Sequence, residues 1–132
     1  EGERALLNLG HTFAHAFERI VAYDGQRLVH GEAVSIGLCC AFRFSQKLGL
    51  AHGQDAQRVE AHLAKVGLPT YIKAIPGWTA DSSAILEAMA QDKKVKRGKL
   101  TFILTRGIGE SFIAPDIATD DVRAFLDDHL AG

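Results

Sequence analysis

Apolar side chains recur every three or four positions over residues 3–23, which predicts one amphipathic helix through that segment. Gly10 lies in its middle and costs about 1 kcal/mol relative to alanine, a penalty that so apolar a helix tolerates. Residues 31–48 are apolar nearly all round, as expected for a helix buried on most sides. Three further helices are predicted: over residues 54–66, from an N-cap at Asp81 or Ser82 through Met89, and over residues 119–130 with Thr119 as cap.

The hydrophobic period changes near the C-terminus. Two short β-prone runs, "KLTFILT" (99–105) and "ESFIA" (110–114), flank the turn-forming stretch "RGIG", and this arrangement predicts a β-hairpin. The earlier segment "PTYIKAIPGW" shows no period and is predicted to be irregular. The expected fold class is therefore mainly α, a multihelical domain with one small β-hairpin.

Composition places the chain among ordinary globular domains. It has 132 residues, of which 47% are hydrophobic and 23% charged, and its net charge is −1. The interspersed charges indicate no nucleic-acid or membrane partner, and no apolar run reaches the length of a membrane span. Adjacent Cys39 and Cys40 would point about 100° apart on a helix, which predicts buried free thiols in a reducing cytoplasm. Because the chain starts without Met and directly in a helical pattern, we expect it to be a piece of a longer protein.

One face of the first predicted helix carries candidate chemistry. Winding residues 3–23 at about 100° per residue brings four polar side chains within roughly 60° of one another, namely Arg4, Asn8, His11 and His15. Such a stripe can simply be the solvated face of the helix. Solvated faces, however, are usually rich in lysine and glutamate, whereas arginine, asparagine and histidine recognise anions and bind metals. The spacing alone leaves both interpretations open.

The histidines allow several interpretations as metal ligands. His11 and His15 are four residues apart, so both could bind one metal, as in the helix of zinc proteases. That motif needs glutamate directly after the first histidine, where this chain has Thr12, so the protease interpretation is weak. His30 in "LVHGEA" is a third candidate, or simply a residue at a helix start. Its neighbour Glu32 is either a ligand or a residue that favours the positive end of the helix dipole.

A basic run precedes the predicted hairpin. The stretch "AQDKKVKRGK" (90–99) contains five basic residues and is either a solvated charge run or the source of a lysine that binds phosphate. The remaining histidines are expected to be exposed and without a functional role: His52, His62 and His129.

Four blocks of sequence carry a resemblance to a known family. They are "RALLNLGHTFAHAFE", "LVHGEAVSIGL", "DKKVKRGKL" and "GIGES", in that order, and together they extend over nearly the whole chain. Their order and approximate spacing resemble those of 3-dehydroquinate synthases, in the C-terminal, mainly helical domain. One departure is Ala14, where the family usually has glycine; the added methyl group should be tolerated. The loop before His30 is also slightly longer than usual.

The resemblance implies a two-domain enzyme, with residues 1–132 forming the helical, metal- and substrate-binding C-terminal domain. The α/β N-terminal domain, which binds NAD, is absent from this chain. A divalent metal, zinc or another such as cobalt, is expected in the cleft between the domains. The family converts 3-deoxy-arabino-heptulosonate 7-phosphate to 3-dehydroquinate and phosphate in the shikimate pathway of aromatic amino acid biosynthesis. The complete enzyme is expected to be a cytoplasmic homodimer.

The resemblance also implies roles for individual residues. His11 and His30 match the family's metal-binding histidines, and the third ligand, a glutamate, would come from the missing N-terminal side. His15 matches a catalytic residue that contacts the substrate. The other substrate contacts implied are Arg4, Asn8 and a lysine of the pair Lys93 and Lys94, with Lys94 preferred.

Three alternative functions remain open at this point. Another sugar-phosphate cyclase would keep NAD and the metal but close a different sugar. A metal-dependent alcohol dehydrogenase of the glycerol-dehydrogenase kind would share the architecture without needing the phosphate-binding arginine and lysine. A non-catalytic helical binding module would need none of these groups. The favoured interpretation predicts a phosphorylated small-molecule substrate and the N-terminal domain as partners, with neither nucleic acid nor membrane involved.

Overall fold

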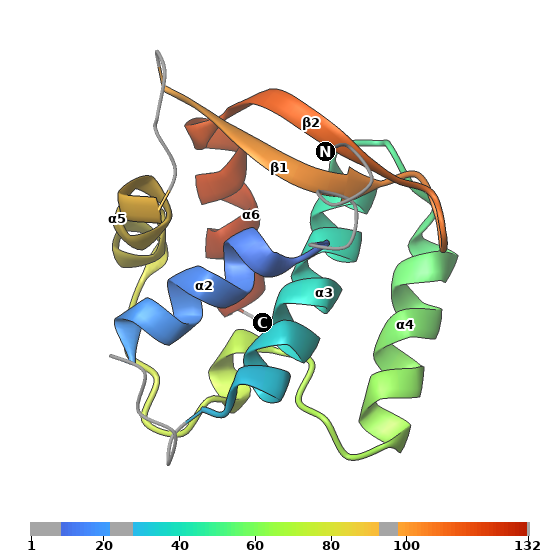
Figure 1. Cartoon of the computed structure of the whole chain (residues 1–132), viewed down its shortest axis with the longest axis horizontal. Coiled ribbons are helices and arrows are strands. Elements are labelled where there is room, and N and C mark those ends of the chain that lie inside the picture. Colours follow the sequence, from blue (N-terminus) through green and yellow to red (C-terminus); the bar gives the residue numbers. More distant parts are fainter. Residues whose placement is uncertain (1–8, 22–27, 93–97, 132) are drawn as a thin grey trace.

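The computed structural model describes residues 9–21, 28–92 and 98–131. In these residues the chain forms five α-helices, one 3-10 helix and a two-stranded antiparallel sheet (Figure 1). The elements follow in the order α2 (His11–Ile20), α3 (His30–Lys47), α4 (Gly53–Lys65), η1 (Ile72–Ala74), α5 (Ser82–Asp92), β1 (Lys99–Thr105), β2 (Ser111–Ala118) and α6 (Thr119–Ala131). The predicted fold class, mainly α with a small hairpin, is confirmed. Among these helices, none combines the length and apolar character needed to cross a bilayer.

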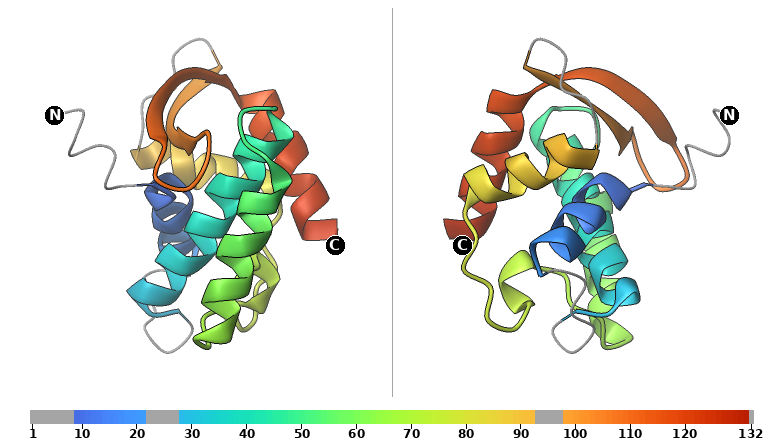
Figure 2. Two further views of the ribbon diagram at one scale, coloured as in Figure 1. Left: turned by 90° about the vertical axis from the view of Figure 1, so that its right-hand side faces the viewer. Right: turned by 60° about the vertical axis from the view of Figure 1, so that its left-hand side comes forward.

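Helix α3 is central to the domain. It packs against α2, α4, β1 and α6, and buried residues occur around most of its circumference. This agrees with its apolar sequence, because a helix surrounded by neighbours has no wide face left for water. The hairpin curves over one end of the helices, and α5 packs against both α2 and α6 (Figures 1 and 2).

Aromatic rings from four elements meet in the core. Phe13 of α2, Phe44 of α3, Phe102 of β1 and Phe125 of α6 are all buried. Ring centres are 5.4 Å apart for Phe13 and Phe102 and 5.2 Å apart for Phe44 and Phe125, within the range in which aromatic pairs attract. The hairpin is therefore part of the same core as the helices.

The prediction of one continuous helix over residues 3–23 is wrong. Leu9 and Gly10 form a turn, Gly10 has a left-handed φ of 84°, and α2 begins only at His11. A Cβ at Gly10 would stand 2.6 Å from the backbone nitrogen of Leu38 and 2.7 Å from the carbonyl carbon of Gly37. Glycine thus serves two needs here, since it adopts the left-handed conformation without strain and lets the chain touch the backbone of α3. Gly10 is visible in the sequence, but the regular spacing of apolar residues on both sides of it favours a continuous helix.

The remaining boundaries differ by smaller amounts. Strand β2 extends to Ala118 instead of ending at Ala114, because pairing with β1 resumes after an irregularity between Leu100 and Phe102. Helix α5 reaches Asp92 instead of Met89, with Asp81 accepting a hydrogen bond from the Ala84 amide (3.0 Å) as its predicted N-cap. The segment predicted to be irregular contains the single turn of η1.

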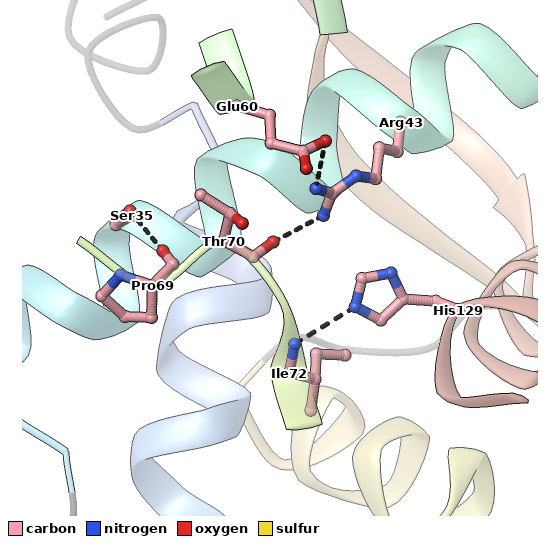
Figure 3. A network of polar contacts seen from close by, with 7 residues as sticks. All are labelled: Ser35, Arg43, Glu60, Pro69, Thr70, Ile72 and His129. Carbon is pink, nitrogen blue, oxygen red and sulfur yellow. Dashed lines mark hydrogen bonds and ion pairs between the residues drawn. The ribbon is translucent and has the colours of Figure 1, made fainter. Parts of the chain in front are cut away.

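The connection from α4 to η1 is tied to α3 by side chains (Figure 3). Ser35 Oγ donates a hydrogen bond to the carbonyl oxygen of Pro69 (2.6 Å). Arg43 Nη1 donates to the carbonyl oxygen of Thr70 (2.6 Å), and Arg43 Nη2 lies 2.9 Å from Glu60 Oε1 on α4. These contacts satisfy backbone groups that no regular element pairs, so the connection is held in place without a helix or strand.

His129 was expected to be exposed, and that expectation is wrong. Its Nε2 accepts a hydrogen bond from the backbone N–H of Ile72 (3.2 Å; Figure 3), and its ring stacks on Tyr71 with centres 5.3 Å apart. Burial, reinforced by the nearby guanidinium of Arg43, lowers the pKa of His129 to about 4. A neutral imidazole therefore joins α6 to η1. The other two histidines, His52 and His62, are exposed as expected.

The adjacent cysteines are buried and free, as predicted. Burial raises the pKa of the Cys39 thiol to about 11, and it raises the pKa of Cys40 further. Both groups are therefore protonated and unreactive near neutral pH, and they pack as small apolar side chains.

Candidate metal centre

Two helix starts bring the candidate histidines together. His11 is the first residue of α2, directly after the turn at Gly10, and His15 follows one helical turn later. His30 is the first residue of α3. The turn at Gly10, just before α2, touches the backbone of α3 at Gly37, seven residues after His30, and the two helices pack against each other.

Ala14 lies at the same contact. It is fully buried, and a Cβ built on Gly37 would stand 3.2 Å from the Ala14 methyl group. Gly37 therefore makes room for the methyl group that this chain carries where the family usually has glycine. The expectation that alanine is tolerated at this position agrees with the packing.

The ring of His11 lies close to the rings of both His15 and His30. Ring centres are 5.5 Å apart for His11 and His15 and 6.3 Å apart for His11 and His30. Two imidazoles bound to one tetrahedral zinc, with Zn–N bonds of about 2.0–2.1 Å, have ring centres roughly 5 Å apart. Either pair could reach that geometry with small side-chain rotations, so the ring distances do not choose between them.

His30 has a hydrogen-bond partner that the sequence interpretation missed. Its Nδ1 lies 2.9 Å from Oε2 of Glu18, a residue in the last turn of α2. The His30 side chain is 63% exposed, whereas that of Glu18 is 10% exposed. A signal was present in the sequence, because seven residues along a helix turn through about 700°, which places Glu18 within about 20° of His11.

Glu32 serves the start of α3. Its Oε1 accepts a hydrogen bond from the backbone N–H of Val29, the N-cap residue (3.1 Å). This is the reciprocal half of a capping box, and the negative charge also suits the positive end of the helix. The simpler of the two interpretations of Glu32 agrees with this contact.

The environment of His11 favours its neutral form. Partial burial lowers the pKa of His11 below its ordinary value, and the neighbouring His15 and His30 lower it further, while Glu18 opposes them. Metals bind the neutral imidazole, so this environment suits a ligand. Within residues 9–21, 28–92 and 98–131, no group of three or more His, Cys, Asp or Glu side chains is arranged to hold a metal ion.

Four of the predicted site residues lie outside the described residues: Arg4, Asn8, Lys93 and Lys94. The turn at Gly10 removes the geometric argument that aligned the first two with His11 on one continuous helix. Their roles as substrate contacts stay predictions.

Solved structures with a similar fold include those of two synthases. One is 2-deoxy-scyllo-inosose synthase, solved with carbaglucose-6-phosphate, NAD+ and Co2+ (TM-score 0.74, 22% identity, covering 92% of this chain and 34% of that one). Another is a 2-epi-5-epi-valiolone synthase from Streptomyces hygroscopicus with NAD+ and Zn2+ bound (TM-score 0.68, 22% identity, covering 94% of this chain and 32% of that one). The chain therefore shares its fold with part of each of these two synthases.

Sequence comparison identifies the family. The family description "3-dehydroquinate synthase C-terminal" matches residues 1–95, and the chain belongs to this family. It is 59% identical over 125 residues to the 3-dehydroquinate synthase of Rhizobium johnstonii, covering 95% of this chain and 33% of the relative. It is 58% identical over 131 residues to that of Agrobacterium fabrum, covering 99% and 35%. The chain thus spans about a third of the length of the curated relatives that it matches.

Proposed function

We propose that this chain is the C-terminal, metal- and substrate-binding domain of a 3-dehydroquinate synthase. The complete protein would convert 3-deoxy-arabino-heptulosonate 7-phosphate to 3-dehydroquinate and phosphate. The observation that carries the proposal is the cluster of His11, His15 and His30 at two helix starts, in a chain 59% identical to an enzyme of that name. Structures of cyclases with other substrates match at only 22% identity, so the comparisons favour 3-dehydroquinate synthase over its siblings.

His11 and His30 are the proposed metal ligands in this chain. The donor set fits a divalent metal such as zinc or cobalt, because both are imidazoles and partial burial lowers the pKa of His11, which favours its neutral form. The contact between Glu18 and His30 Nδ1 supports choosing His30, since it leaves Nε2 free to bind. A further ligand is proposed from the part of the complete protein that precedes this chain. A metal held by His11 and His30 would supply Lewis acidity towards a substrate hydroxyl, and NAD would supply the redox chemistry that side chains lack.

His15 is proposed to be a catalytic residue that hydrogen-bonds the phosphate end of the substrate. It lies one turn from His11 on α2, so a substrate bound at His11 would reach it. Arg4, Asn8 and Lys93 or Lys94 are proposed to hold the substrate's anionic groups, for which guanidinium and ammonium groups are suited. Together these groups would fix the phosphate so that its departure needs little further help from the protein.

The proposal extends to the rest of the complete protein. We infer an N-terminal NAD-binding α/β domain, with the metal in the cleft between the two domains. We also infer a homodimer that works in the cytoplasm. The buried, protonated thiols of Cys39 and Cys40 support a reducing compartment.

The test is a phosphate-release assay. The complete protein, supplied with the heptulosonate phosphate, NAD and zinc, should release phosphate and form 3-dehydroquinate, whereas residues 1–132 alone should not. Phosphate release only from a different sugar phosphate would favour a sibling cyclase. Oxidation of simple alcohols without phosphate release would favour a dehydrogenase, and absence of turnover in the complete protein would favour a binding module. Turnover by residues 1–132 alone would overturn the two-domain proposal.

A further inference from the structure

We propose that Glu18 is a positioning residue for His30, whose Nδ1–H it holds so that Nε2 is presented to the metal. The inference rests on the proposed function, because it takes His30 to be a ligand. It goes further by assigning a role to a residue in which the sequence interpretation saw none.

The hydrogen bond fixes both the tautomer and the direction of the ring. An ionised carboxylate only accepts hydrogen bonds, so the nitrogen 2.9 Å from Glu18 Oε2 must carry the proton. His30 Nδ1 is therefore the donor, and in the neutral ring Nε2 keeps its lone pair. With 63% of its side chain exposed, His30 has little packing of its own to hold it. The buried carboxylate of Glu18 supplies an anchor on a different helix.

The placement of Glu18 is difficult to explain by stability alone. It lies in the last turn of α2, where the helix dipole disfavours a negative charge, and the residue is only 7% exposed. Burying a carboxylate is unfavourable unless it gains a partner. The partner that the described residues show is His30, and a cation bound at His30 Nε2 would compensate the charge further.

The other carboxylate near His30 serves a different contact. Glu32 is two residues along α3, but its Oε1 accepts a hydrogen bond from the amide of Val29. The two glutamates therefore have different roles: Glu32 caps α3, and Glu18 orients the ring of His30. Carboxylates that orient ligating histidines typically change metal affinity 10–100-fold when removed.

The first test measures zinc affinity of the complete protein by competition with a chromogenic chelator. Glu18→Ala should weaken zinc binding about 10–100-fold. Glu18→Gln keeps the size and an acceptor oxygen but loses the charge, so it should recover part of that loss. Glu87→Gln, an exposed glutamate on α5, is the matched control and should bind zinc as the unmodified protein does. Circular dichroism identifies any variant that fails to fold, and the near-isosteric Glu18→Gln keeps the test valid in that case.

The second test needs no metal and reads the tautomer directly. Nitrogen-15 NMR of labelled histidine in the metal-free protein should show His30 with its proton on Nδ1. Glu18→Ala should move the proton towards Nε2, which free imidazoles favour, whereas a purely structural role for Glu18 would leave the tautomer unchanged.

Failure of the positioning role of Glu18 can be distinguished from failure of the proposed metal ligands. If His30→Ala loses zinc while Glu18→Ala and Glu18→Gln keep full affinity, the positioning role is wrong and the proposed ligands stand. If His30→Ala keeps its zinc, the ligand assignment in the proposed function fails and the inference about Glu18 fails with it.

Discussion

The contact between α2 and α3 predicts that Gly10→Ala is among the most damaging small substitutions in the chain. Gly10 has φ 84°, and an alanine forced into the left-handed region costs about 1–2 kcal/mol. Its Cβ would also stand 2.6 Å from the Leu38 nitrogen and 2.7 Å from the Gly37 carbonyl carbon, closer than a Cβ can approach a backbone atom. Relieving such overpacking typically costs a further 1–3 kcal/mol. The sum, about 2–5 kcal/mol, is a large part of the ordinary stability of a domain.

The assay is urea unfolding of the 132-residue chain followed by circular dichroism, with two glycine controls that separate the contributions. Gly49 also has a positive φ (78°), but a Cβ there meets nothing within 4 Å, so Gly49→Ala should show only the conformational cost. Gly31 lies in α3 with open space around it, so Gly31→Ala should be neutral or stabilising by up to about 1 kcal/mol. A Gly10→Ala variant no less stable than Gly49→Ala would refute the close contact between the helices.

Three further predictions concern the site and its surroundings. In the complete protein, His11→Ala and His30→Ala should each lose most bound zinc by elemental analysis, whereas His15→Ala should keep zinc and lose turnover; equal zinc loss in His15→Ala would contradict this division. Lys94→Ala should raise KM for the heptulosonate phosphate with zinc content unchanged. Unaltered kinetics would instead support the interpretation of Lys94 as part of a solvated charge run. Partial burial, with the guanidinium of Arg43 nearby, lowers the pKa of His129 to about 4, so the unfolded chain binds a proton more readily, and stability should fall as the pH drops from about 6.5 towards 4. The loss should be at most about 3 kcal/mol, reduced by solvent screening, and His129→Gln should show a flatter urea-midpoint profile over this range.

The local pattern of apolar and polar residues predicts those elements whose structure depends mainly on their own residues. Helix α3 was predicted within one residue at each end, because a long run that is apolar nearly all round has no alternative to burial as a helix. The hairpin was predicted because β-prone runs on both sides of "RGIG" have few other ways to pair. The burial of Cys39 and Cys40 followed from the same apolar run. The metal ligands, by contrast, came from resemblance to a family, since spacing alone could not separate His15 from His30.

Only the tertiary structure decided the contacts between segments distant in sequence. The break at Gly10 depends on how closely the chain there approaches Gly37, a contact that the apolar periodicity of residues 3–23 does not reveal. His129 is half-buried because the segment around η1, 57 residues earlier, offers it an amide and an aromatic ring. Glu18 meets His30 because two helices pack together, although the two residues are 12 positions apart in the sequence. Periodicity reports which face of an element is apolar, whereas the partner that each polar side chain finds depends on packing between elements, and packing is fixed only when the whole core forms.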